Sequence, residues 1–285
     1  MSRRFAAGTA VGATLVLSLT GCLGDSGGGS AGGGGVQLTA AQVLEKASQK
    51  TGQVDTYKAD FTMNVGTQQG ALNMHALGQF RLKPSLAFTM NVDKMGMGGQ
   101  SMPIGAIQVV YLDKVIYMKS AQLSQATGGK PWLKMDLGRQ AQQSGFNLDA
   151  LMNQSQQVNP AEQTKMLTAS KDAKKVGEES INGVKTTHYT GSITVAEAMN
   201  KLDAKTRQQL QKVYQQVGAT KIFFDLWADG QQLPRKLTTK IAIPQGSTSN
   251  TIIYEDYGSP VNVSAPPADQ VGDFRGLSGG RTSGN

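Results

Sequence analysis

Apolar and polar residues alternate strictly over much of the first half of the chain. Phe61, Met63 and Val65 fall on one face of an extended segment, with Asp60, Thr62 and Asn64 between them. The same period of two recurs over residues 72–82, 86–92 and 109–117. A period of two is typical of strands that bury one face. The pattern therefore predicts a long antiparallel sheet with one apolar face.

Helix signals occur before, between and after these strands. Thr39 begins a helix that Gly52 ends, residues 147–157 carry an apolar stripe, and Asn159-Pro160 and Thr194 to Glu197 are helix starts. A last helix after Asp203 precedes three strands over 221–228, 233–243 and 251–257. Strands and helices do not alternate as in a parallel α/β fold. We expect an α+β fold in which an antiparallel curled sheet forms a half-barrel and helices cover its concave face.

The first 22 residues have the pattern of an export signal. Arg3 and Arg4 precede an apolar stretch over residues 5–19 that is too short for a good membrane span. The segment Leu19-Thr20-Gly21-Cys22 then places small residues before the one cysteine of the chain, as in a bacterial lipobox. We expect a lipoprotein signal peptide over 1–21 and a diacylglyceryl group on Cys22, whose two acyl chains suffice for a stable membrane anchor.

A glycine-rich stretch follows the cysteine. Eight of the twelve residues from Gly24 to Gly35 are glycine, and a coil of this kind reaches roughly 20 Å. The sequence thus predicts a lipidated tether over 22–35, a folded domain over 36–271 and a disordered tail over 272–285. Removal of Arg3 and Arg4 with the signal peptide would lower the formal charge from +8 to +6 (26 basic minus 20 acidic residues), and this basic balance suits an anionic lipid surface and does not require a nucleic acid partner. We expect the protein on the outer face of the cell membrane.

The composition leaves little material for catalysis. One Cys and two His exclude Cys-based zinc sites and iron–sulfur clusters and leave too few ligands for a metal site built on histidines. No phosphate-binding loop, zinc-protease motif or calcium-binding loop is present. We therefore expect no enzyme activity, no cofactor and no metal.

Three segments resemble a known family. They are GEESINGVKTTHY at 177–189, LWADG with LPRKL at 226–230 and 233–237, and YGSPV with APP at 257–261 and 265–267. These segments look like two hairpins and the closing strand of actinobacterial lipid-carrier lipoproteins of the LppX/LprG type. That family is similar in shape to the LolA and LolB carriers and to the sensor RseB. The resemblance implies a LolA-like domain that holds lipid acyl chains between sheet and helices, without naming the lipid.

Apolar positions on the expected strands and helices are the candidate lipid site. Twelve methionines favour an adaptable apolar cavity, although plain core packing would use the same residue types. The predicted lining is Phe61, Met63, Leu72, Met74, Phe80, Phe88, Met90, Tyr111, Tyr117, Phe224 and Leu226. The predicted helix cover is Leu148, Leu151, Met152, Leu210, Val213 and Tyr214.

Two functions are compatible with these features. The first is a membrane-anchored lipoprotein that binds a membrane lipid or glycolipid and carries it within the cell envelope. The alternative is an envelope sensor or protein-interaction module of the same fold with a filled core. No residue pattern identifies a protein partner, a donor or an acceptor.

Overall fold

The computed structural model describes residues 38–67, 70–102, 105–139, 159–244 and 246–273. The signal peptide with Cys22, the glycine-rich tether, the helix expected over 147–157 and residues 274–285 lie outside the described residues. The predicted boundaries of these parts of the chain stay predictions.

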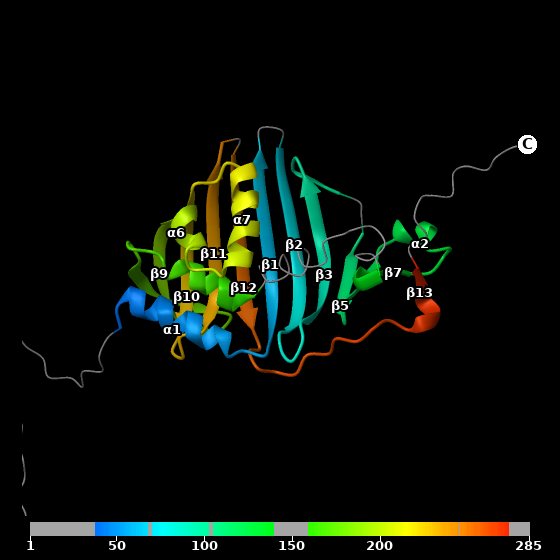
Figure 1. Cartoon of the computed structure of the whole chain (residues 1–285), viewed down its shortest axis with the longest axis horizontal. Helices are drawn as coiled ribbons and strands as arrows, with labels where there is room; N and C mark the ends of the chain where they lie inside the picture. The colour runs from blue at the N-terminus through cyan, green and yellow to red at the C-terminus, as the bar shows by residue number, and fades with distance from the viewer. Residues whose placement is uncertain (1–37, 68–69, 103–104, 140–158, 245, 274–285) are drawn as a thin grey trace, which may run out of the picture. The chain divides into compact units, whose positions relative to one another are not determined.

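The described residues form a mixed α+β body around one sheet of 13 strands (Figure 1). The strands are β1 (Thr56–Thr67), β2 (Gly70–Arg81), β3 (Ala87–Met97), β4 (Gln100–Ser101), β5 (Ile107–Leu112), β6 (Val115–Lys119), β7 (Trp132–Asp136), β8 (Lys174–Ile181), β9 (Val184–Thr194), β10 (Lys221–Asp229), β11 (Pro234–Ile243), β12 (Gly246–Glu255) and β13 (Val271–Asp273). The helices are α1 (Ala40–Gly52), α2 (Leu123–Ala126), α5 (Pro160–Leu167), α6 (Val195–Met199) and α7 (Ala204–Gln216), with a 3-10 turn η2 (Ala268–Gln270).

The sheet is antiparallel except at one edge. Its order is β13-β7-β6-β5-β3-β2-β1-β12-β11-β10-β9-β8, with β4 paired to β3, and only the β13–β7 pair is parallel among the pairs that the structure describes. Within the described residues the end strands β13 and β8 each pair on one side, so this sheet is not closed. The expected α+β class and large antiparallel sheet are confirmed.

Local sequence signals account for the ends of the elements. Thr39 and Gln42 form a reciprocal capping box at α1, and Thr194 and Glu197 form another at α6. Asn159 caps α5 with Pro160 in its first turn. These helix starts are those that the sequence predicts.

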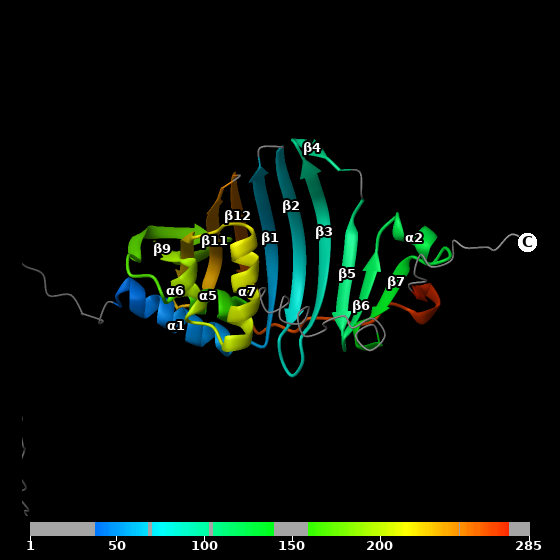
Figure 2. The ribbon, with the colours of Figure 1, turned by 45° about the horizontal axis from the view of Figure 1, so that its top comes forward.

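Helices α1, α5, α6 and α7 share one hydrophobic core with the sheet, and we call the side of the sheet that faces this core the helix face. Figures 1 and 2 show α6 and α7 in front of β9 to β12. The main core lies there and contains Leu44 and Ala47 of α1, Leu167 of α5, Leu210 of α7, and Phe224 and Leu237 of the sheet. α1 and α5 are joined by a buried hydroxyl contact of 3.0 Å between Thr51 Oγ1 and Thr164 Oγ1. The opposite side of the sheet is called the outer face.

An aromatic row fills the helix face across four strands. Tyr57 stacks on Phe80 at 4.7 Å between ring centroids, Phe80 contacts Phe88 at 5.6 Å, and Phe88 stacks on Tyr111 at 5.4 Å. Gly78 lies beneath this row, and a Cβ there would approach the Phe80 ring to 2.4 Å. The glycine thus lets the ring cover the strand directly.

Asp172 ties the loop after α5 to β9. Its carboxylate accepts hydrogen bonds from Ser170 Oγ at 2.8 Å, from the Ser192 amide at 2.7 Å and from Ser192 Oγ at 2.6 Å. These bonds, with those of Ser192 the strongest, hold the pKa of Asp172 at about 2 against 3.8 for a free side chain.

Asp172→Asn is expected to destabilise the fold by about 1 kcal/mol at pH 7, because the charged hydrogen bonds are lost at a solvent-exposed site. The pKa of Asp172 is lowered by folding, so its stabilisation is present above about pH 4 and is lost as the pH falls towards 2. The free energies of unfolding of wild type and variant, measured in urea, should therefore converge between pH 5 and about pH 2. A gap that stays constant over this range would contradict the assignment.

Candidate functional site

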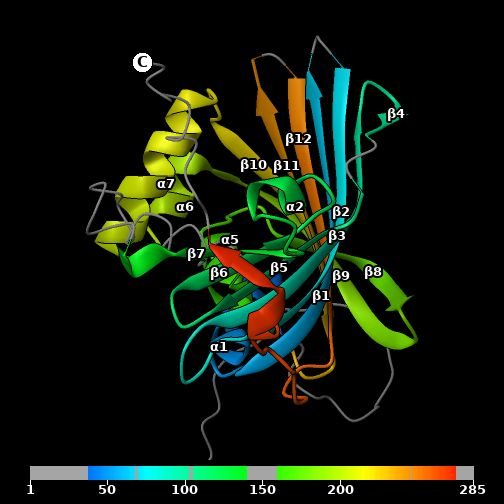
Figure 3. The same cartoon turned by 90° about the vertical axis from the view of Figure 1, so that its right-hand side faces the viewer.

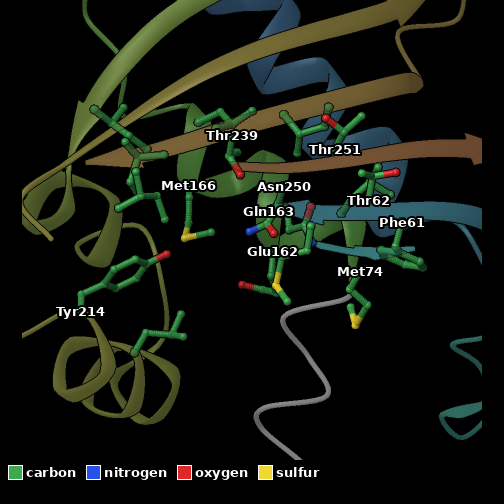
Figure 4. Close-up of a pocket in the computed structure, with 18 of the residues that line it drawn as sticks. Phe61, Thr62, Met74, Glu162, Gln163, Met166, Tyr214, Thr239, Asn250 and Thr251 are labelled. Carbon is green, nitrogen blue, oxygen red and sulfur yellow. The ribbon is translucent and has the colours of Figure 1, made fainter. Parts of the chain in front are cut away.

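A cavity of about 340 Å³ lies on the helix face between the helices and the sheet. Its apolar walls come from the sheet strands β1, β2, β3, β9, β10, β11 and β12 and from α5 and α7. Figure 4 shows Tyr214 of α7 on one side, Phe61 and Met74 on the other, and Met166 of α5 between them. This volume lies near the lower end of the range for small-molecule pockets, about 300–1,000 Å³, which is enough for part of one hydrocarbon chain.

The alternation of the strands explains why these side chains meet. Phe61 and Met63 of β1 face the same side as Met74 and Ala76 of β2, because Met63 pairs with Met74 and Phe61 with Ala76. On β11, Leu237, Thr239 and Ile241 recur at every second position and all line the cavity. The wall is therefore the apolar face that the sequence pattern predicts.

Met166 and Glu162 of α5 reach the cavity from one side of the same helix. They are four residues apart, so they lie on the same helical face. Leu210 and Tyr214 of α7 have the same spacing and line the opposite side of the cavity. Burial raises the pKa of the Tyr214 phenol, so it stays neutral at physiological pH.

A small polar set interrupts the apolar wall. Glu162 and Gln163 of α5 lie near Thr239 and Asn250 of β11 and β12 (Figure 4). Gln163 Oε1 accepts a hydrogen bond of 2.9 Å from the buried Tyr254 hydroxyl. Glu162 Oε2 is buried and has no hydrogen-bond partner. Since a buried carboxylate oxygen is costly without a donor, this atom marks a position that a donor group would satisfy.

Positive side chains are absent from the part of the cavity lining that the structure describes, which contains no Lys or Arg. The cavity is thus suited to an apolar chain that ends in a neutral group carrying a hydrogen-bond donor, and it has no cation to compensate a phosphate inside it.

Six of the residues predicted from sequence line this cavity. Phe61, Met63, Met74 and Met90 belong to its strand wall, and Leu210 and Tyr214 to its helix wall. The other predicted positions are distributed between the core, the sheet ends and the outer face. Whether any of them binds lipid stays a prediction.

Several predicted lining residues belong to the solid core. Phe224 and Leu226 are 1% and 0% exposed, and Phe80, Phe88 and Tyr111 form the aromatic row. Their rings and methyl groups are in contact with other side chains, so they support the wall from behind or beside it. Leu72 lies near the start of β2, is half-buried and stands outside the cavity.

Two predicted positions differ from the expected orientation. Tyr117 lies on the outer face, because the turn at Asp113-Lys114 pairs Tyr111 with Ile116 rather than with Tyr117. Val213 is 48% exposed. It lies at the edge of the apolar side of α7, and only the centre of that side faces the sheet. Leu148, Leu151 and Met152 lie outside the described residues.

Sequence reasoning missed the polar part of the cavity. It took α5 for a source of apolar contacts and did not single out Glu162, Gln163, Thr239 or Asn250. The period-two pattern of β11 was a usable signal, because Thr239 lies between Leu237 and Ile241 on the apolar phase. Nothing in the sequence shows that Glu162 lacks a partner.

Both histidines lie on the outer face, away from this cavity. His75 lies between Asp60 at 3.0 Å and Asp93 at 2.5 Å, and the hydrogen bond with Asp93 raises its pKa. His188 stacks on Trp227 at 4.2 Å and contacts Asp225 at 2.9 Å. Among the described residues no group of three or more His, Cys, Asp or Glu side chains could hold a metal ion. In the same part of the chain, no helix has the length and apolar character needed to cross a bilayer.

Comparison with known proteins gives relatives in Streptomyces. The chain is 32% identical over 253 residues to an uncharacterized 31.2 kDa protein from the rplA–rplJ intergenic region of Streptomyces griseus, covering 85% of this chain and 82% of that protein. It is 25% identical over 248 residues to a putative lipoprotein of Streptomyces coelicolor, covering 83% and 76%. No family model matches the chain.

Solved structures with a similar arrangement include two mycobacterial proteins. LprF from Mycobacterium bovis overlaps 80% of this chain and 96% of its own, with a TM-score of 0.49 and 14% identity. The Mycobacterium tuberculosis lipoprotein LppX overlaps 79% and 98%, with a TM-score of 0.47 and 13% identity. LppX is one of the lipoproteins of the type that the sequence segments resemble.

Proposed function

The chain belongs to the family of the 31.2 kDa Streptomyces griseus protein, and we propose that it is a membrane-anchored lipoprotein that binds a lipid and carries it within the cell envelope. One observation carries this proposal: an apolar cavity lies between the sheet and helices α5 and α7. The name of the Streptomyces coelicolor relative, a putative lipoprotein, supports the anchoring part. In this proposal the sheet is a half-barrel whose concave side is the helix face.

The cavity supplies affinity without any catalytic group. Removing an acyl chain from water stabilises the complex by about 25 cal/mol per Å² of apolar surface. The methionines Met63, Met74, Met90 and Met166 can change rotamer to fit chains of different shape. Release then requires only that α5 or α7 move away from the sheet, since no bond is made or broken.

Anchoring and binding act together in this proposal. The acylated Cys22 would hold the protein at the membrane, and residues 22–35 would let the domain turn between the membrane and the cell wall. A carrier needs such freedom because its cavity must face both donor and acceptor. The lipid and its acceptor are not specified by this geometry.

The carrier role is tested by lipid transfer between vesicles. A protein of residues 36–285 is added to a mixture of two kinds of vesicle. Donor vesicles contain a quenched fluorescent acyl lipid, and acceptor vesicles are unlabelled. We expect the transfer rate to rise in proportion to the protein concentration. Binding without transfer would favour the alternative, a lipid-responsive sensor, and the absence of both would contradict the proposal.

Glu162→Gln tests the polar end of the cavity. Glu162 is proposed to accept a hydrogen bond from a hydroxyl of the ligand, and its replacement by Gln, a weaker acceptor, should weaken binding of a monoacylglycerol about tenfold. A fatty acid methyl ester of the same chain length lacks the donor, so its affinity should change less than twofold. Binding of each ligand is measured directly by isothermal titration calorimetry. Equal effects on both ligands would contradict the assigned contact.

A further inference from the structure

A second groove lies on the outer face of the sheet, on the side away from α5 and α7. Its volume is about 690 Å³, and its floor is formed by β1, β2, β3 and β5. Its wall is the segment 256–270 that connects β12 to β13, which we call the strap. The strap is the orange and red coil that passes the lower ends of these strands in Figure 1 and leads to β13 in Figure 3.

The strap is fixed at both ends. Thr56 Oγ1 donates a hydrogen bond of 2.7 Å to the Ser259 carbonyl, and Val263 is buried against Ala87 and Val110. At the far end β13 pairs with β7. Between these attachments Pro266 and Pro267 have fixed φ angles and no N–H to donate. The groove is therefore formed before any ligand arrives, which lowers the cost of binding.

Uncharged polar side chains lie among the apolar residues that line the groove. They are Gln79, Thr89, Asn91, Gln108, Asn262 and Ser264. Asn91 and Gln108 are direct cross-strand partners on β3 and β5, and Gln79 pairs with Thr89 in the neighbouring row. Four of the six are primary amides, each with donors and an acceptor in one plane.

The amides are not used by the fold itself. Within the described part of the chain, the side chains of Gln79, Asn91, Gln108 and Asn262 make no hydrogen bond to one another or to other residues. Asn91 Oδ1 is buried and without a partner. A buried amide oxygen that accepts no hydrogen bond lowers the stability of the fold and contributes nothing to it. Its position in the lining points to a ligand that donates to it.

Charges at one end of the groove are already paired. Lys58 Nζ lies 2.7 Å from Asp256, Asp60 lies 3.0 Å from His75, and Glu255 accepts a hydrogen bond of 2.5 Å from Asn182. Trp132 lies at the other side of the groove. The centre is thus neutral, rich in amides and flanked by one indole ring.

We propose that this groove binds an uncharged saccharide chain. Vicinal hydroxyl groups donate and accept together, as planar amides do, and the apolar face of a sugar ring packs on an indole. Neighbouring strands are about 4.7–4.9 Å apart, close to the length of one pyranose ring, so Asn91 and Gln108 are spaced to contact successive sugars. An extended peptide fits this groove less well. Such a peptide binds by pairing with a free strand edge, and the groove floor is a sheet face that offers none.

The test uses intrinsic fluorescence, since the chain has two tryptophans, Trp132 and Trp227. Full-length protein carrying Trp227→Phe reports on Trp132 alone. It is titrated with linear hexasaccharides of glucose, mannose and N-acetylglucosamine. We expect at least one to change the emission of Trp132 with saturation in the micromolar to millimolar range. Asn91→Ala and Gln108→Ala should each weaken this binding at least fivefold, with Gln231→Ala, an exposed amide outside the groove, as the matched control.

A second experiment distinguishes free saccharides from the sugar headgroups of lipids. Vesicles containing a digalactosyl lipid replace the free sugars, and binding only there, with the same response to Asn91→Ala, assigns the groove to glycolipid headgroups. Thermal unfolding verifies that each variant is folded. The proposal is overturned if none of the sugars and vesicles binds. It is also overturned if the Asn91 and Gln108 variants bind as tightly as the protein without these substitutions. A peptide library that saturates the groove when no sugar does also overturns it. These outcomes do not depend on the lipid cavity, because the groove shares none of its polar residues.

Discussion

Phe80→Ala is expected to lower the free energy of unfolding by about 3–5 kcal/mol, which is typical for removing a buried phenylalanine ring. Phe80 is 0% exposed, and its ring contacts Tyr57, Phe61 and Phe88. The ring also covers Gly78, so its loss leaves the backbone of β2 exposed to a void. Neighbours in this row are themselves aromatic and cannot collapse into the space without leaving their stacked positions.

The matched control for this prediction is Phe223→Ala. Phe223 has the same side chain but lies on the outer face of β10 with 46% exposure. Its replacement should cost less than about 1 kcal/mol. Both values are measured by urea unfolding at neutral pH. A small effect of Phe80→Ala, close to that of Phe223→Ala, would show that Phe80 borders empty space rather than the core.

Met74→Trp is expected to abolish lipid uptake while it leaves the protein folded. Met74 of β2 lines the cavity on the side away from Tyr214, and a larger indole would occupy part of its volume of about 340 Å³. Uptake of a fluorescent fatty acid should fall at least tenfold. Because an existing void receives the added atoms, the stability should change by less than the roughly 1–3 kcal/mol that overpacking of a filled core costs.

Leu77→Trp is the control for the cavity prediction. Leu77 lies on the same strand, faces the outer side and is 49% exposed. It should leave fatty acid uptake within a factor of two of the wild type. If Met74→Trp instead unfolds the protein and uptake by the folded fraction is unchanged, the apolar site lies elsewhere.

The pattern of alternation predicted the sheet and the direction of most side chains, because a period of two is a local property. Phe61, Met63 and Met74 were placed on the cavity side for this reason. Tyr117 was also predicted on the cavity side, and this was wrong, since the phase of a strand after a hairpin depends on the length of the turn. With Asp113 and Lys114 as the turn, Leu112 pairs with Val115, and the tyrosines at 111 and 117 face opposite sides.

The division between core and cavity was not available from sequence. Phe80 and Met90 have the same apolar phase, but one fills the aromatic row and the other borders the void. Which of them is covered depends on where α5 and α7 lie, and that position results from contacts far apart in the chain, such as Thr51 with Thr164. The unpartnered oxygen of Glu162 is likewise a property of the packed structure.

The claim that the helix face holds a lipid chain is tested most directly by the mass of the purified protein. A protein of residues 36–285 is expressed in a bacterial host and purified without detergent. It is measured by native mass spectrometry and then extracted with organic solvent. We predict one acyl-bearing lipid per protein, lost in Met74→Trp and kept in Leu77→Trp. A protein that has the mass of the bare chain and takes up no offered lipid would contradict the account.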